Sequence, residues 1–240
     1  MAEGRQTPVG FGAALLAIDT CGPSGSVALG RVAGRDVEIL GQRELAGRSY
    51  SATLVAAIGE LLAESGVALK DLGGIVAVNG PGSFTGVRVG LSAVKGLAEG
   101  ARIPVVAVSR LQVLSRKSGV PCCALDAHRG EVFLRLEEFG CAPRELLAGA
   151  TELAANERVP LRIAVCDEAA GALLGSAWPA AQLVMSAAPL AADALRLGEA
   201  RLAAGGQVDL ALLDGHYLRR SDAEIFGEAA AARRDGSARK

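Results

Sequence analysis

Residues 80–86 combine the residue types that a phosphate-binding loop needs. The stretch reads Gly-Pro-Gly-Ser-Phe-Thr-Gly and follows an apolar run at 75–78. Glycines let backbone amides approach a ligand closely, and hydroxyl side chains can hydrogen-bond phosphate oxygens. A helix expected from about Val87 adds the partial positive charge of its N-terminus. No Gly-Lys-Ser/Thr follows, so the Walker pattern is not matched, and a ligand-free strand-to-helix turn is the competing interpretation.

An aspartate marks the end of an earlier apolar run. Asp19 follows residues 14–18 and precedes the turn residues 22–25. A carboxylate at the tip of a central strand is a usual place for magnesium or a phosphate-linked water. The alternative is that it only accepts hydrogen bonds from the turn. Loop and aspartate together predict a weak or vestigial ATP or ADP cleft, formed by Asp19, Thr20, Ser26, Gly80, Gly82, Ser83 and Thr85.

The hydrophobic pattern predicts an α/β protein in which one arrangement occurs twice. Strands are expected at 14–18, 26–29, 37–45, 75–78, 105–108, 122–126, 131–137, 161–165 and 182–185, and helices at 51–64, 87–99, 110–118, 168–174 and 189–204. Both halves open with strand, turn and strand, and in both an aspartate ends the first strand. This repetition indicates a duplicated fold with a crevice between two lobes.

We expect three segments. Residues 1–110 form an N-terminal lobe that carries the glycine-rich loop and two long helices, and 111–220 form a smaller α/β lobe. The last stretch, 221–240, is rich in alanine and charge without an apolar stripe, so we expect a flexible tail.

Composition argues against several functions. The formal net charge is −1, and aromatic residues make up only 3%, which favours neither a basic nucleic-acid surface nor a base-stacking platform. The five cysteines show no CxxC spacing, and only two histidines accompany them, so we expect no metal site and a reducing cytoplasm. The N-terminal apolar run is too short for a membrane span, and we expect no membrane contact.

Four stretches together resemble one known family. They are LAIDTCGPSGSVAL, GPGSFTGVRVGLSAVKGLAEG, LDAHRGEVF and HYLRR, within residues 14–220. The likeness is densest at 79–108, and the combination is similar to the bacterial TsaB (YeaZ) family. That family takes part in making N6-threonylcarbamoyladenosine at position 37 of tRNA.

The resemblance implies an actin-like, Hsp70-like (ASKHA) fold with two lobes. It also implies a non-catalytic dimerisation subunit that activates a catalytic paralogue, TsaD, with the ATPase TsaE as third member. Alone, such a chain would form a homodimer, and tRNA would be reached through the complex. No catalytic residue and no required cofactor are expected. Two alternatives stay open: an ATP-dependent transferase or kinase using Asp19 with residues 80–86, and an M22-like glycoprotease.

Two departures from the wider superfamily bear on these alternatives. The catalytic paralogue carries a His-x-x-x-His metal pair where this chain has Arg110 and Leu114. After the strand at 161–165, relatives have a glycine-rich phosphate turn, whereas this chain has Cys166-Asp-Glu168. The resemblance further implies that helices 51–64 and 86–99 meet the matching pair of the partner. The expected interface residues are Leu54, Ile58, Leu61, Val87, Leu91 and Val94.

Overall fold

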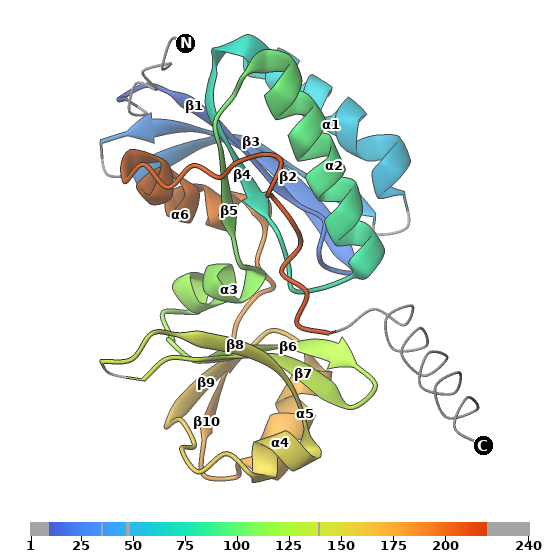
Figure 1. Ribbon diagram of the computed structural model, residues 1–240, viewed down its shortest axis with the longest axis vertical. Helices are drawn as coiled ribbons and strands as arrows, with labels where there is room; N and C mark the ends of the chain where they lie inside the picture. The colour runs from blue at the N-terminus through green and yellow to red at the C-terminus, as the bar shows by residue number, and fades with distance from the viewer. Residues whose placement is uncertain (1–9, 35, 47–48, 139, 220–240) are drawn as a thin grey trace, which may run out of the picture.

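The structure, a computed structural model, describes residues 10–34, 36–46, 49–138 and 140–219, and forms two lobes, each built on a five-stranded sheet (Figure 1). The predicted tail, 221–240, lies outside the described residues. The first sheet consists of β1 (Ala14–Asp19), β2 (Ser24–Ala33), β3 (Asp36–Ala46), β4 (Leu72–Val78) and β5 (Val105–Val108). The second consists of β6 (Cys123–His128), β7 (Glu131–Leu136), β8 (Arg144–Gly149), β9 (Arg162–Val165) and β10 (Gln182–Met185).

The two sheets share one topology, which confirms the predicted duplication. The first has the order β3-β2-β1-β4-β5, and the second, read as β8-β7-β6-β9-β10, repeats it. In both, the first three strands pair antiparallel and the last two join in parallel. The fold is therefore the two-lobed, actin-like α/β architecture expected from the sequence.

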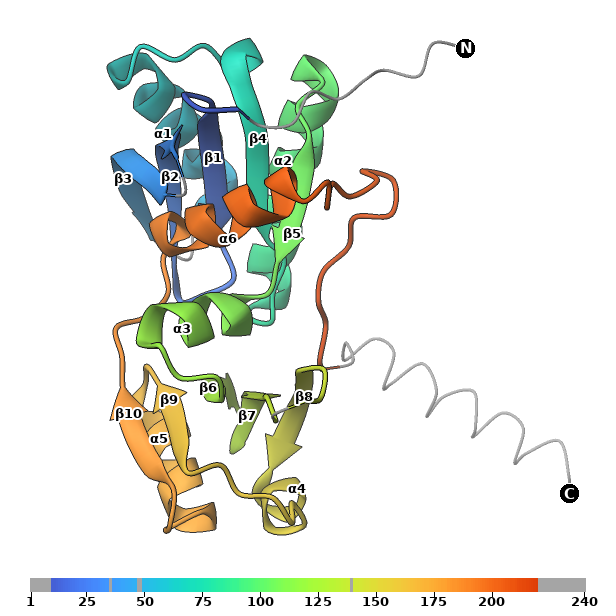
Figure 2. The same cartoon turned by 90° about the vertical axis from the view of Figure 1, so that its left-hand side faces the viewer.

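Helices cover both faces of the first sheet (Figure 2). On one face lie α1 (Tyr50–Glu64) and α2 (Phe84–Ala101), and on the other lies α6 (Ala191–Ala203). The short 3-10 helix Leu69–Asp71 leads into β4. Because β1 and β4 are buried between these layers, they are continuous apolar runs with no alternating pattern.

The position of α6 differs from the expected lobe boundaries. Residues 111–220 were expected to form the second lobe, but Leu195 and Leu202 of α6 are buried in the core of the first. Ser26 of β2 accepts a hydrogen bond from the Ala191 amide at 2.8 Å and so caps this helix. The second lobe is therefore an insertion, and the chain returns to complete the first.

Around the second sheet lie α4 (Ala150–Ala154) and α5 (Glu168–Ala177), while α3 (Arg110–Ser118) lies between the lobes. The segment 204–219 then runs from α6 along the junction to the second lobe (Figure 1, orange to red). Among the described residues, no helix is both long and apolar enough to cross a membrane.

One carboxylate joins the lobes. Glu145 of β8 accepts hydrogen bonds from Ser109, which precedes α3, at 2.6 Å and from His216 of the segment 204–219 at 2.8 Å. Its other oxygen accepts from Arg135 of β7 at 2.9 Å. The side chain is 9% exposed, so these contacts are shielded from solvent.

The junction is expected to weaken in acid. Burial raises the pKa of Glu145, but hydrogen bonds from His216, Ser109 and Arg135 outweigh it, and the pKa lies below its ordinary value of 4.5. A lowered carboxyl pKa stabilises the fold fully above the unfolded-state pKa, and this contribution is lost as the pH falls through the folded-state pKa. As the pH falls from roughly 5 to 3, the melting temperature of the wild type should therefore drop more steeply than that of Glu145→Gln, as measured by thermal unfolding. Identical pH slopes for the two proteins would contradict this role.

Candidate functional site

The glycine-rich loop connects β4 to α2, as predicted, and it packs against residues 20–21 of the same chain. Ser83 caps α2 by accepting from the Gly86 amide at 3.3 Å. A Cβ at Gly82 would come closer than 3.0 Å to the Cys21 carbonyl, and one at Gly86 would do the same at Thr20. These glycines therefore let the loop pack against residues 20–21, a role that needs no ligand.

Asp19 is paired with an arginine from the start of α3. Its Oδ2 lies 3.2 Å from Arg110 Nε, and the side chains are only 3% and 8% exposed. Its Oδ1 accepts from the Cys21 amide at 2.8 Å, the turn bond given as the alternative. Burial lowers the pKa of Arg110, but the Asp19 charge, the neighbouring Cys21 and Cys166 and the hydrogen bond to Asp19 together raise that pKa overall. Both carboxylate oxygens are thus engaged, and Arg110 stands where the resemblance places a metal histidine in the paralogue.

The surroundings of this pair are apolar and closed. The Tyr50 hydroxyl donates to the Gly22 carbonyl at 2.9 Å, and burial raises the Tyr50 pKa to about 12. Burial, reinforced by the nearby Asp19 charge, also raises the pKa of the Cys21 thiol. Leu114, the second position of the absent histidine pair, is fully buried among apolar side chains.

The other predicted cleft residues separate into two groups. Thr20 donates its hydroxyl to the Gly86 carbonyl at 2.7 Å, which places it beside Gly82 and Ser83. Thr85 is exposed on the first turn of α2. Ser26 caps α6, and Gly80 lies against the backbone of His216. The structure therefore joins Asp19, Thr20, Gly82 and Ser83 in one place. Gly80 lies there too, since its carbonyl accepts from the Arg110 amide at 2.7 Å, whereas the Ser26 hydroxyl is bound to α6.

The second lobe places carboxylates opposite this region. Asp167 caps α5 through the Ala170 amide at 2.7 Å and accepts from the Asp126 amide at 3.0 Å. His128 pairs with Asp126 at 2.7 Å, and its side chain is 85% exposed, as expected for a solvated turn. In the part of the chain that the structure describes, no group of three or more histidine, cysteine, aspartate or glutamate residues could hold a metal ion.

The expected interface residues point inward. Leu54, Ile58, Leu61, Val87, Leu91 and Val94 are between 1% and 6% exposed. They belong to the core of the first lobe, because α1 and α2 turn these stripes toward their own sheet. The residue assignment was therefore wrong, since a helix in an α/β lobe uses its strongest apolar stripe for its own sheet.

The opposite side of the same two helices is open and poor in charge. We call it the outer helix face. Its exposed members are Ala52, Val55, Ala56 and Gly59 of α1 and Ser92 and Gly96 of α2, and the half-buried Ala93 and Leu97 of α2, which also contact the core, border it. Val55 is 61% exposed, and a side chain at Gly59 or Gly96 would meet nothing within 4 Å. The sequence signal for this face was Val55, an apolar residue that lies outside the main apolar stripe of its helix and is surrounded by small residues.

The HYLRR stretch, residues 216–220, contacts the second lobe through Arg219. Arg219 donates to the Ala127 carbonyl at 2.7 Å and pairs with Glu131. It therefore fixes the segment 204–219 to the β6–β7 turn. Arg220 lies outside the described residues.

Comparisons with known proteins agree with this architecture. The family model of TsaD, tRNA N6-adenosine threonylcarbamoyltransferase, matches residues 41–142. The TsaB protein of Escherichia coli K12, named for tRNA threonylcarbamoyladenosine biosynthesis, is 37% identical over 125 residues, which are 50% of this chain and 52% of that protein. The Bacillus subtilis TsaB is 35% identical over 129 residues, 52% of this chain and 55% of that protein. The matched segment thus spans about half the length of these curated relatives.

A solved structure extends the likeness beyond that segment. YeaZ from Pseudomonas aeruginosa superimposes with a TM-score of 0.69 at 28% identity, covering 86% of this chain and all of the other. The sequence matches and this superposition together include both lobes. By sequence over about half of its length, and by structure over both lobes, this chain is similar to proteins of the TsaB (YeaZ) family.

Proposed function

We propose that this protein is the non-catalytic dimerisation and activating subunit of the machinery that makes N6-threonylcarbamoyladenosine in tRNA. It would act on a TsaD-like catalytic paralogue, with a TsaE-like ATPase as third member. Two observations support the pathway: the names of the E. coli and B. subtilis relatives, and the match of residues 41–142 to the transferase model.

The buried Asp19–Arg110 pair is the observation that carries the accessory role. A nucleotide or metal would have to displace Arg110 from Asp19, and the freed charge would stay in a buried place. Leu114, next along the same face of α3, is a core residue that offers no ligand atom. The region that performs chemistry in the paralogue therefore serves stability here, and the protein acts through its surface.

The outer helix face is the surface that we propose for the partner. Small residues at Gly59 and Gly96 let another helix pair come close, and Val55 offers an apolar anchor at the centre. Patches of this kind on a soluble protein commonly mark interaction sites. The partner would be the TsaD-like chain, and in its absence a second copy of this chain. Docking would order the catalytic site of the partner.

Val55→Glu tests this surface. A carboxylate buried without a counterion at the interface costs about 3 kcal/mol, equivalent to roughly a 100-fold weaker association. Co-purification with the TsaD-like protein of the same cell and analytical ultracentrifugation should show the loss. Leu161→Glu, which adds the same charge at an 88% exposed position of the second lobe, should bind as the wild type does. Unchanged association of Val55→Glu would refute the assignment.

Activity measurements separate the accessory role from the alternatives. The purified protein alone should not transfer threonylcarbamoyl to tRNA, and adding TsaD-like and TsaE-like partners should supply the reaction. Full transfer by the protein alone would overturn the proposal. Calorimetric binding of ATP at micromolar concentration, abolished in Asp19→Ala, would favour the transferase or kinase, and a stoichiometric metal would favour the glycoprotease.

A further inference from the structure

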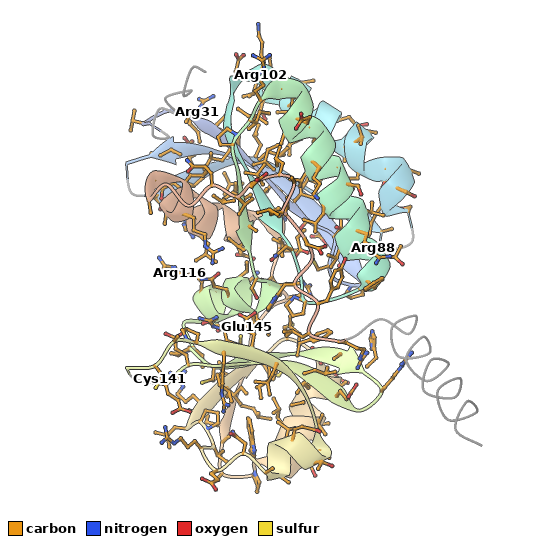
Figure 3. All side chains as sticks on the ribbon, viewed as in Figure 1. Arg31, Arg88, Arg102, Arg116, Cys141 and Glu145 are labelled. Atoms are coloured by element: carbon orange, nitrogen blue, oxygen red, sulfur yellow. The ribbon has the colours of Figure 1, made fainter. Side chains whose placement is uncertain are left out.

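Glu145 lies at the junction of the lobes (Figure 3), where it lines a pocket. The volume of this pocket is about 470 Å³. Ser109, Gln112, Arg135, Glu145, Arg201 and His216 supply its polar wall. Neither Asp19 nor any residue of the outer helix face lines this junction pocket, so the proposed function does not use it.

Arg201 of α6 is the least satisfied charge of the junction pocket. Its guanidinium donates to the Ala107 carbonyl and, at 2.6 Å, to the Gln112 side-chain oxygen, both neutral acceptors. Among the described residues, no carboxylate lies within 4.0 Å of it. Burial is the main cause that lowers the pKa of Arg201; the Glu145 charge raises this pKa, the Arg135 charge lowers it, and the net shift is downward. Three of its five N–H donors have no protein acceptor in the described residues.

Glu145 is the carboxylate of the pocket wall, and it is not bound to Arg201. It accepts hydrogen bonds from Ser109, His216 and Arg135 instead. Arg135 is bound to Glu145 and Glu137, and its Nε is buried without a partner in the described structure. The wall of the pocket therefore carries two arginines and one carboxylate, an excess of positive charge that favours an anion.

We propose that the junction pocket binds a small molecule through a phosphate or carboxylate group, with Arg201 as the anchoring residue. A planar guanidinium presents parallel donors that match the two oxygens of either group. The volume falls within the usual range for small-molecule pockets, about 300–1,000 Å³. Residues of both lobes form the wall, so the bound molecule would also hold the lobes together.

Calorimetry at constant ionic strength tests the proposal, with pyrophosphate, inorganic phosphate and citrate as probes. The wild type should bind at least one of these three probes. Preference for pyrophosphate or phosphate identifies a phosphate group as the recognised group, and preference for citrate identifies a carboxylate. Arg201→Gln should weaken that binding about tenfold or more, because it removes the forked donor. Arg116→Gln removes one exposed charge from α3, outside the pocket (Figure 3), and should leave the affinity unchanged.

A second pair of variants guards against a folding defect in Arg201→Gln. Pro143 is an exposed residue at the pocket wall, so Pro143→Glu adds a repelling carboxylate without disturbing the core. It should weaken binding, whereas Pro143→Gln should not. The proposal would be overturned by any of three results. Binding could survive both Arg201→Gln and Pro143→Glu, Arg116→Gln could weaken binding as much as Arg201→Gln does, or the wild type could bind none of the probes. Binding of an acidic peptide alone would also overturn it, since the partner would then be a protein.

Discussion

Asp19→Asn is expected to lower the free energy of unfolding by about 3–5 kcal/mol. The asparagine keeps the shape of the side chain and the bond to the Cys21 amide, but Arg110 stays charged in a buried place without a counterion. Urea denaturation of the protein without nucleotide measures the loss. If Asp19→Asn unfolded at the same urea concentration as the wild type, Asp19 would not stabilise the fold through Arg110, and a role in ligand binding would be favoured.

Two controls define this result. Asp19→Asn combined with Arg110→Met removes both charges and should recover most of the loss, as expected when both members of a buried pair are replaced. Asp36→Asn breaks the Arg196 pair, whose side chains are 64% and 59% exposed, and should leave the urea midpoint nearly unchanged, because solvent screens this pair. Equal losses at positions 19 and 36 would contradict the argument from burial.

Gly86→Ala is expected to destabilise the protein by about 1–3 kcal/mol or more, although alanine is normally the better helix former. The added methyl would meet the Thr20 carbonyl, a backbone atom that can move only if the β1–β2 turn and α2 separate. Thermal and urea unfolding would show the change.

Gly171→Ala is the matched control for that substitution. Gly171 lies within α5, and its added Cβ would make an ordinary contact of 3.8 Å with Val165. This variant should gain about 0.5–1 kcal/mol from helix propensity. A Gly86→Ala protein as stable as the wild type would mean that the loop does not need close packing.

Local pattern predicted most elements of this fold. The apolar spacing at 51–64 corresponds to α1, and the two strand-turn-strand openings correspond to β1–β2 and β6–β7. The repeat was visible because each half opens with the same order and ends its first strand in an aspartate. Helix α2 begins at Phe84, three residues before the predicted start, because Ser83 caps it.

Contacts between distant residues were beyond the sequence. The helix 189–204 was recognised, but its place on the first sheet depends on the bond from Ala191 to Ser26, 165 residues apart. Arg110 was recognised as a poor metal ligand, yet its partner Asp19 lies 91 residues away. The direction of the α1 and α2 stripes was also undetermined, since an apolar stripe suits a sheet and a partner equally. Local periodicity carries no information on which surface covers which.

The return of α6 to the first sheet has a consequence for synthesis on the ribosome. When residues 1–110 have emerged, one face of their sheet still lacks the helix whose Leu195 and Leu202 complete that core. The strands of the inserted lobe, from Cys123 to Met185, emerge next as one continuous stretch and contain the whole second sheet. The second lobe can thus form during translation before the first one closes, although the first begins earlier in the sequence.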